Sequence, residues 1–121
     1  MKLILVEDDV FFRKFYVEKL KEKGFEIEEA DDGEQGLEKI RSFKPDLVLL
    51  DIIMPKKDGF EVLKDMQADS SLKDIPVLVF STLGQETDVA KAKKLGATDY
   101  VNKSLFDFNQ LLEKINTLTK K

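Results

Sequence analysis

Leu47-Val48-Leu49-Leu50-Asp51 is the most apolar run in the chain, and it ends abruptly in an acidic residue. A short, continuous apolar run is typical of a strand in a parallel sheet that is covered on both faces. Ligands of such sheets bind at the carboxyl ends of the strands. The run therefore predicts a central strand that carries the Asp51 carboxylate at a functional edge.

The same alternation of strand and helix patterns occurs five times along the chain. Short apolar runs predict the strands, and apolar residues at helical spacing between them predict amphipathic helices. The predicted strands are 2–6, 25–30, 47–50, 76–80 and 100–101. The second strand alternates apolar and acidic residues, so one of its faces is wet and we expect it at an edge of the sheet. The last predicted helix spans 108–118 and runs on to Lys120 and Lys121.

Five strand–helix units of this length predict an α/β fold in which a five-stranded parallel sheet lies between two layers of helices. The strand order 2-1-3-4-5, counted along the chain, places the alternating strand at an edge and leaves strands 1, 3 and 4 in the middle. This arrangement is a (βα)5 three-layer sandwich of the flavodoxin-like type. Its crevice lies between strands 1 and 3, at their carboxyl ends, where we expect ligand chemistry.

The composition excludes several kinds of chemistry. The 121 residues suffice for a single domain, which we expect to span 1–121. The chain contains no cysteine and no histidine, which removes disulfides, thiolate nucleophiles, imidazole bases and the common zinc sites. A net charge of −4 and a pI of about 5.0 argue against nucleic acid as a direct ligand. The sequence shows no signal peptide and no apolar run long enough for membrane insertion, so we expect a cytoplasmic protein.

Chemically useful side chains follow four of the five predicted strands. Glu7 and Asp8 follow the first strand, Asp51 the third, Ser81 the fourth and Lys103 the fifth. Three carboxylates that lie close together repel one another unless a cation sits among them, and Mg²⁺ prefers such a set of oxygen ligands. A carboxylate beside Mg²⁺, a lysine and a hydroxyl is equipped to attack a phosphoryl donor. Asp51 is the candidate nucleophile.

The residues of this site belong to motifs that resemble a known family. In chain order, these motifs are Leu5-Val6-Glu7-Asp8-Asp9, Asp51-Ile52-Ile53-Met54-Pro55, Asp58-Gly59, Ser81 after an apolar strand, and Gly96-Ala97 before Tyr100 and Lys103. Together they resemble the response-regulator receiver domain of two-component signalling, over essentially the whole chain. The resemblance is to single-domain members such as those of chemotaxis, which carry no output domain.

The resemblance implies a role for each acidic residue of the site. Asp51 is implied as the phosphoacceptor, which receives a phosphoryl group from a histidine kinase or a histidine phosphotransfer protein. Asp8, Asp51 and the backbone carbonyl of Ile53 are implied as Mg²⁺ ligands, and Glu7 as a ligand through a water. The domain is then a signalling switch and not an enzyme, apart from self-catalysed phosphorylation and dephosphorylation.

The resemblance also implies how phosphorylation at the site changes a distant surface of the domain. Lys103 and Ser81 are implied as catalytic residues that bind the new phosphoryl oxygens. As Ser81 moves toward the phosphate, Tyr100 turns inward. The surface formed by the fourth helix, the fifth strand and the fifth helix then changes its affinity for a downstream protein target. In free-energy terms, the phosphoryl group biases a pre-existing equilibrium between two states.

Two departures from the family pattern lie in the loops around this site. Ser104 follows Lys103 where family members usually carry proline, so the sequence leaves the geometry of that peptide bond open. Ile53 and Leu83 stand where polar side chains in relatives help to position a hydrolytic water. Because apolar groups cannot orient that water, we predict slow self-dephosphorylation.

The first predicted helix carries aromatic residues on more than one side. Phe12, Phe15, Tyr16 and Leu20 recur at helical spacing and predict its buried stripe. Phe11 lies roughly 100° round the helix from Phe12, so we expect it to be exposed. One interpretation is packing against the neighbouring loop. The other is a hydrophobic contact for the helical bundle of a kinase or phosphotransfer domain, which dock near this helix in the family.

Three other functions use similar residues. The main alternative is a pseudo-receiver, which is not phosphorylated and serves only as an interaction module. A phosphohydrolase with an aspartyl nucleophile carries Asp-x-Asp after its first strand, whereas this chain has Glu7-Asp8-Asp9 there. A flavodoxin-like cofactor carrier needs a glycine- and hydroxyl-rich loop at the same place, and an acidic loop would repel the flavin phosphate.

Overall fold

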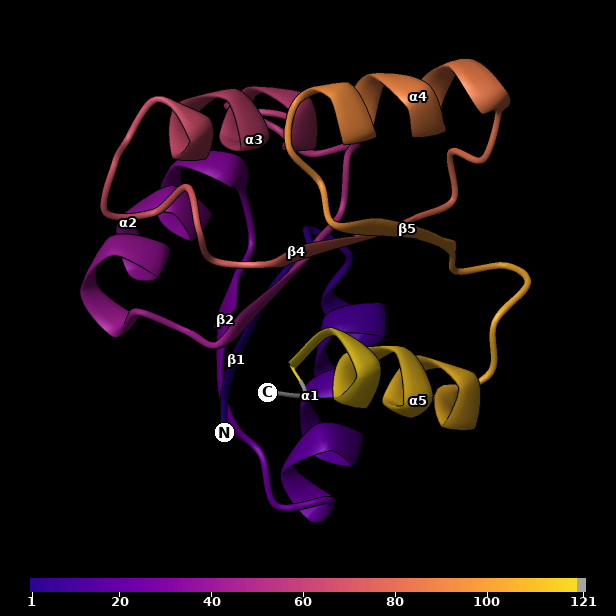
Figure 1. Ribbon diagram of the computed structural model, residues 1–121. Helices are drawn as coiled ribbons and strands as arrows, with labels where there is room; N and C mark the ends of the chain where they lie inside the picture. Colours follow the sequence, from indigo (N-terminus) through magenta and orange to yellow (C-terminus); the bar gives the residue numbers. More distant parts are fainter. Residues whose placement is uncertain (120–121) are drawn as a thin grey trace.

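The five predicted strands form one parallel sheet in the order β2-β1-β3-β4-β5 (Figure 1). The strands are β1 (Lys2–Val6), β2 (Glu26–Ala30), β3 (Leu47–Leu50), β4 (Val77–Ser81) and β5 (Asp99–Asn102). The helices are α1 (Val10–Glu22), α2 (Gly33–Phe43), α3 (Gly59–Gln67), α4 (Glu86–Lys94) and α5 (Phe108–Thr119). The computed structural model describes residues 1–119, so the predicted extension of the last helix to Lys120 and Lys121 lies outside the described residues. The α/β prediction and its strand order are confirmed.

Two layers of helices cover the sheet, with α1 and α5 on one face and α2, α3 and α4 on the other (Figure 1). Successive residues of a strand point to opposite faces. In β1, Leu3 and Leu5 pack with α1 and α5, whereas Ile4 and Val6 pack with the opposite layer. All four side chains are at most 1% exposed, and each one stabilises the fold by roughly 1.5–3 kcal/mol. Burial on both faces explains why the central strands read as continuous apolar runs.

β2 is the edge strand that its alternating sequence predicts. It pairs with β1, and its Glu26 and Glu28 side chains are exposed. Ile27 lies between them in sequence and packs against the α1 and α5 core. The exposed face therefore carries Glu26 and Glu28, whereas Glu29 lies on the Ile27 face, is half-buried and pairs with Arg13 of α1.

Close backbone contacts shape the loops that follow β1 and β3. The Asp9 carboxylate caps α1 by accepting the Phe12 N–H at 3.0 Å. At the start of α3, a Cβ on Gly59 would lie 2.4 Å from the Asp51 carbonyl oxygen, so only glycine fits there. The Gly59 N–H donates to the Ile52 carbonyl at 2.8 Å. The connection between β3 and α3 is thereby folded back against the end of β3.

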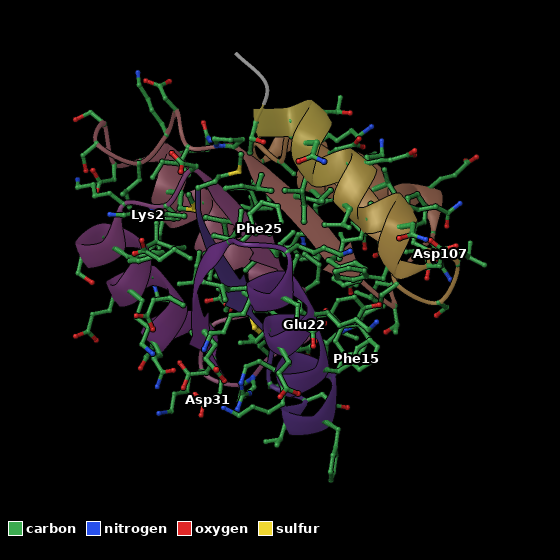
Figure 2. The ribbon with its side chains drawn as sticks, turned by 90° about the horizontal axis from the view of Figure 1, so that it is seen from below. Lys2, Phe15, Glu22, Phe25, Asp31 and Asp107 are labelled. Atoms are coloured by element: carbon green, nitrogen blue, oxygen red, sulfur yellow. The ribbon has the colours of Figure 1, made fainter. Side chains whose placement is uncertain are left out.

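The predicted buried stripe of α1 is wrong in one residue. Tyr16 and Leu20 are buried and Phe12 is partly buried, but Phe15 is 50% exposed. Phe15 lies on the flank of α1 next to α5 (Figure 2), where its ring stands edge-on to Tyr16 with centroids 5.1 Å apart. The Lys19 ammonium lies 5.4 Å from the centroid of the same ring. Tyr16, four residues after Phe12, therefore faces the sheet, whereas Phe15, three residues after Phe12, lies at the exposed side of the helix.

The sequence left open the peptide geometry after Lys103 and predicted no membrane-spanning segment. Every peptide bond among the described residues is trans, including the bond between Lys103 and Ser104. No helix within residues 1–119 is long and apolar enough to cross a membrane.

Candidate functional site

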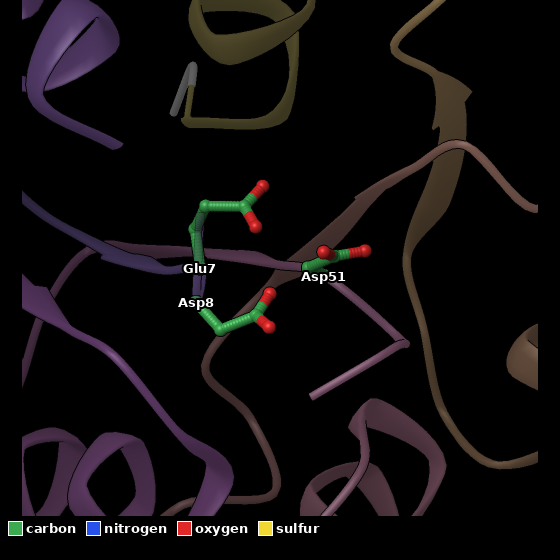
Figure 3. Close-up of side chains that lie close together, drawn as sticks. All are labelled: Glu7, Asp8 and Asp51. Carbon is green, nitrogen blue, oxygen red and sulfur yellow. The ribbon is translucent and has the colours of Figure 1, made fainter. Parts of the chain in front are cut away.

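Three carboxylates meet at the carboxyl edge of the sheet, where β1 and β3 end (Figure 3). Val6 pairs with Leu50 in the parallel register of these strands, so the residues that follow them lie side by side. Glu7, Asp8 and Asp51 each offer an oxygen within 4.8 Å of the others. Glu7 and Asp51 are buried, whereas Asp8 is exposed. The structure thus brings together the three acidic residues that the sequence analysis selected.

The Lys103 ammonium lies against the two buried carboxylates. Its Nζ donates to Glu7 Oε1 and lies 3.3 Å from Asp51 Oδ2. The Lys103 N–H donates to the Ser81 carbonyl at 3.0 Å, which ties the loop after β5 to the end of β4. The Lys103 side chain is only 7% exposed. A buried cation therefore offsets part of the negative charge of the cluster.

The environment of Glu7 disfavours its charged form. Burial raises the pKa of the Glu7 carboxyl to about 7, and the nearby Asp51 charge acts in the same direction. The hydrogen bonds from the Lys103 ammonium and the Asp9 N–H oppose this rise. The raised pKa thus reflects the burial of Glu7 first and the neighbouring Asp51 charge second.

The donor set fits a hard divalent cation. Carboxylate and carbonyl oxygens with room for water are the ligands that Mg²⁺ takes in proteins, and the chain has no histidine or cysteine to favour zinc. Asp51 Oδ1 accepts the Ile52 N–H at 2.7 Å, which holds the carboxylate in one orientation. Asp8 is exposed at the mouth of the cluster, where it is accessible to an ion from solvent.

The cluster opens into a pocket of about 510 Å³. Its lining residues are Glu7, Asp8, Asp9, Phe12, Asp51, Ile53, Thr82, Lys103 and Ser104. Phe12, Thr82 and Ser104 line the pocket although the sequence motifs did not predict them as site residues. Thr82 directly follows Ser81, and Ser104 directly follows Lys103, so their place in the sequence could have predicted them as pocket residues. The place of Phe12 depends on the packing of α1 and had no such signal.

Ser81 and Tyr100 lie together on adjacent strands. Ser81 is fully buried, its Oγ accepts the Leu83 N–H at 3.3 Å, and it is not among the residues that line the pocket. The Tyr100 hydroxyl donates to the Leu83 carbonyl. Burial raises the pKa of Tyr100, as does the Asp88 charge, while a hydrogen bond with Ser81 opposes the rise. The two predicted switch residues are therefore neighbours that share Leu83.

Of the predicted apolar residues Ile53 and Leu83, the first lines the pocket and the second does not. Ile53 lines it and is 55% exposed, so its side chain offers no polar group to the opening. Leu83 is half-buried and packs against the core. Phe11 is 87% exposed, which confirms the expectation from its position on the helix. Leu105, which follows the pocket residue Ser104, is a further large exposed apolar side chain.

The fold and the site together define a class of protein. A parallel sheet of this order binds ligands at the carboxyl ends of its strands, and here an acidic cluster and a buried lysine lie at that edge. Residues 3–116 match the family model described as the response regulator receiver domain. The chain belongs to this family. Receiver domains are signalling switches rather than classical enzymes, and phosphorylation and Mg²⁺ binding are typical of them.

Curated relatives include both short and long proteins. Protein PilH of Pseudomonas aeruginosa is 36% identical over 119 residues, which cover 98% of this chain and 98% of that protein. Chemotaxis protein CheY of Bacillus subtilis is 36% identical over 117 residues, which cover 95% of this chain and 94% of that protein. The DNA-binding dual master transcriptional regulator RpaA of Synechocystis is 32% identical over 120 residues, 99% of this chain. The chain spans about half the length of that relative, 49%.

Solved structures agree with the family assignment. The BeF3-activated N-terminal receiver domain of Klebsiella pneumoniae RstA has a TM-score of 0.92 at 26% identity, with 100% of both chains covered. The chemotaxis protein CheY4 of Vibrio cholerae has a TM-score of 0.89 at 29% identity, with 97% of both chains covered. The fold of this chain is thus that of receiver domains along its full described length.

Proposed function

We propose that Asp51 accepts a phosphoryl group from a histidine kinase or a histidine phosphotransfer protein, and that the modified domain changes its affinity for a downstream protein target. One observation carries this proposal: the Asp51 carboxylate lies beside two further carboxylates and a buried ammonium at the mouth of an open pocket. A nucleophile, a cation-binding set and a fixed positive charge are the parts that phosphoryl transfer to a carboxylate requires.

In the transfer step, an Asp51 carboxylate oxygen attacks the phosphorus of a phosphohistidine. The phosphorus–nitrogen bond breaks, its electron pair stays on the imidazole nitrogen, and an aspartyl phosphate forms. The Ile52 N–H holds Asp51 Oδ1 and thereby fixes the direction of the carboxylate. Asp8, Asp51 and the Ile53 carbonyl would hold Mg²⁺, with Glu7 acting through a water. When bound, the ion supplies positive charge to the transferring phosphoryl oxygens.

Lys103 and Ser81 recognise the product. The phosphoryl group adds negative charge at Asp51, so the Lys103 ammonium turns from the carboxylates toward a phosphoryl oxygen. Ser81 gives up its contact with the Leu83 N–H and donates its hydroxyl to another phosphoryl oxygen. Once Ser81 has moved toward the phosphoryl group, Tyr100 is held in its inward position, packed against the core with its hydroxyl on the Leu83 carbonyl. The surface of α4, β5 and α5 changes with it, because the phosphoryl group stabilises one of two pre-existing states.

The aspartyl phosphate is proposed to persist. Ile53 lines the pocket and Leu83 follows Ser81 by two residues, and neither apolar side chain offers a hydrogen bond to a water in line with the phosphorus. Slow hydrolysis gives the modified domain time to find its target.

The phosphodonor is proposed to dock on α1. Phe11 is the most exposed large apolar side chain described, and Val10 and Phe15 on the same helix are also exposed. An apolar patch beside the pocket suits the side of a helical bundle that carries the phosphohistidine. Phe11→Ala is expected to slow transfer from the kinase and to leave phosphorylation by a small donor unchanged. An unchanged rate with the kinase would remove this part of the proposal.

Intact mass measurement tests the central proposal. The protein is incubated with Mg²⁺ and acetyl phosphate, beside Asp51→Asn and a sample with EDTA. A Mg²⁺-dependent gain of one phosphoryl group that the variant lacks is the expected result. No gain with acetyl phosphate, together with no binding of beryllofluoride, would refute phosphorylation and favour the pseudo-receiver. Beryllofluoride binding without a gain would show that the site is intact but depends on its kinase.

A further inference from the structure

The Lys103 ammonium has a third neighbour besides the carboxylates of Glu7 and Asp51. Its Nζ lies 4.2 Å from the centroid of the Phe12 ring, which also lines the pocket. A cation over the face of an aromatic ring is attracted by the negative charge of that face, and the attraction grows when water is excluded. The Lys103 side chain is 7% exposed, so this contact is largely desolvated.

The Phe12 ring is itself held in place by its surroundings. It packs against Tyr16 with centroids 4.6 Å apart and against Phe80 on β4 with centroids 5.5 Å apart. Tyr16 in turn stands edge-on to Phe80 at 5.2 Å. The Asp9 carboxylate also holds the Phe12 backbone N–H at the first turn of α1. The ring is therefore a fixed surface, and the flexible partner of the contact is the lysine.

The three neighbours of Lys103 differ in what happens to them during phosphoryl transfer. The charge on Asp51 changes when the phosphoryl group arrives, and Glu7 belongs to the cation-binding set. Only the ring is the same before and after the reaction. A partner that does not change holds the ammonium near the pocket while its carboxylate contacts are exchanged for a phosphoryl oxygen.

We propose that Phe12 is a positioning residue, whose ring holds the Lys103 ammonium at the pocket through a cation–π contact. The inference rests on the proposed function of Asp51 and assigns to α1 a role in the reaction itself, separate from donor docking. On this inference, the rate at which Asp51 is phosphorylated depends on the electron density of the Phe12 ring face as well as on the volume of the Phe12 side chain.

The chain offers a matched control for this contact. The Lys91 ammonium lies 4.3 Å from the centroid of the Phe60 ring, between α3 and α4 and apart from the residues that line the acidic pocket. The two distances from ammonium to ring centroid are nearly the same, although Lys91 is more exposed than Lys103. A change of ring electronics at Phe60 perturbs a cation–π pair without touching Lys103.

Stepwise fluorination of the ring tests the inference, because fluorine removes negative charge from the ring face with little change of shape. Phenylalanines with one, two and three fluorines are placed at Phe12, or at Phe60 in the control series. Phosphorylation by acetyl phosphate with Mg²⁺ is followed by intact mass. The rate is expected to fall progressively at Phe12, in total by between about two- and thirty-fold, and to stay constant at Phe60. A rate that does not depend on fluorination at Phe12 overturns the inference.

A second measurement needs neither phosphorylation nor metal. Protons held over an aromatic ring are shifted upfield in NMR spectra, so the Lys103 ε-methylene protons are expected to show such a shift. Phe12→Leu is expected to abolish this upfield shift and to slow phosphorylation. Phe12→Trp is expected to keep the upfield shift and the phosphorylation rate of the unmodified chain. An unshifted Lys103 signal in the unmodified chain overturns the inference.

The two experiments separate this inference from the proposed function. A chain that is phosphorylated on Asp51 at a rate independent of ring fluorination keeps the proposed function and loses the role of Phe12. A chain that is not phosphorylated by acetyl phosphate or by its kinase loses both. Thermal unfolding of each variant shows whether a slower rate comes from an unfolded fraction.

Discussion

Replacement of Arg13 by methionine is expected to destabilise the fold far more than replacement of its neighbour Lys14. Arg13 is 8% exposed; its guanidinium donates to the Glu7 carbonyl at 2.8 Å and to Glu29 Oε1 at 2.9 Å. It therefore ties α1 both to the acidic loop after β1 and to the edge strand β2. Methionine keeps the apolar stem of the side chain and removes the charge and the donors.

The contacts of Arg13 set the expected magnitude. A buried acceptor that loses its donor costs about 1–3 kcal/mol, and a buried ion pair that loses one partner costs about 3–5 kcal/mol. The Glu29 side chain is 26% exposed and keeps Lys14 as a partner, so the full ion-pair cost does not apply. We expect Arg13→Met to lower the free energy of unfolding by about 2–4 kcal/mol.

Lys14 provides the control because it donates to the same Glu29 oxygen at the same distance, 2.9 Å. Its side chain is 61% exposed, and exposed ion pairs contribute about 0–1 kcal/mol. The free energy of unfolding is compared by urea unfolding of the unmodified chain, Arg13→Met and Lys14→Met. Arg13→Met is expected to lower the urea midpoint by roughly 1–2 M. Equal losses in the two variants would refute the argument that the Glu7 carbonyl contact stabilises the fold.

Three further predictions concern the metal site, the pH dependence and the phosphate lifetime. Asp8→Asn removes one carboxylate of the cluster, and we expect Mg²⁺ affinity in isothermal titration calorimetry to fall by more than the roughly 10- to 100-fold that loss of an outer-shell partner costs. For Asp99, burial acts to raise its pKa, but the hydrogen bond from Lys114 and further contacts outweigh it, so the pKa is lowered. The folded pKa therefore lies below the unfolded one, and this stabilisation is present above the unfolded pKa and disappears as pH falls through the folded pKa. Lys114→Met is expected to lower the urea midpoint at pH 7 and to match the unmodified chain well below about pH 4; an equal difference at both pH values would contradict this. Ile53→Asn supplies a polar group that orients water, so the aspartyl phosphate on Asp51 is expected to decay faster, as followed by intact mass over time. A phosphate lifetime of only seconds in the unmodified chain would contradict the prediction of slow hydrolysis.

Much of the fold follows from patterns that are local in sequence. The continuous apolar run at 47–50 identifies a strand buried on both faces, and the alternation at 25–30 identifies the wet edge strand. Right-handed crossovers then leave few ways to order five strands. Because all parallel strands end at the same edge, Glu7, Asp8 and Asp51 were predictable as neighbours before their distances were known.

Other features depend on contacts between distant parts of the chain. Lys103 and Glu7 lie 96 positions apart, and their ion pair requires the Lys103 side chain after β5 to reach across the ends of β4 and β3. Of the two hydroxyls at the end of β4, Thr82 lines the pocket while Ser81 is buried, a choice made by the direction of each side chain. Local periodicity does not report such directions.

The packing of α1 decided what the aromatic residues and the arginine do. Helical spacing placed Phe12 and Phe15 on one stripe, but the packing of α1 put Phe12 beside the Lys103 ammonium and left Phe15 half-exposed. The same packing buried Arg13 against the Glu7 carbonyl, although arginine side chains in proteins are mostly exposed. Strand identity and the acidic edge arise from hydrophobic periodicity and chain connectivity, which are encoded locally. Which residues each charged or aromatic side chain contacts depends on side-chain rotamers and on distances between elements. Both are set only when the helices have packed on the sheet.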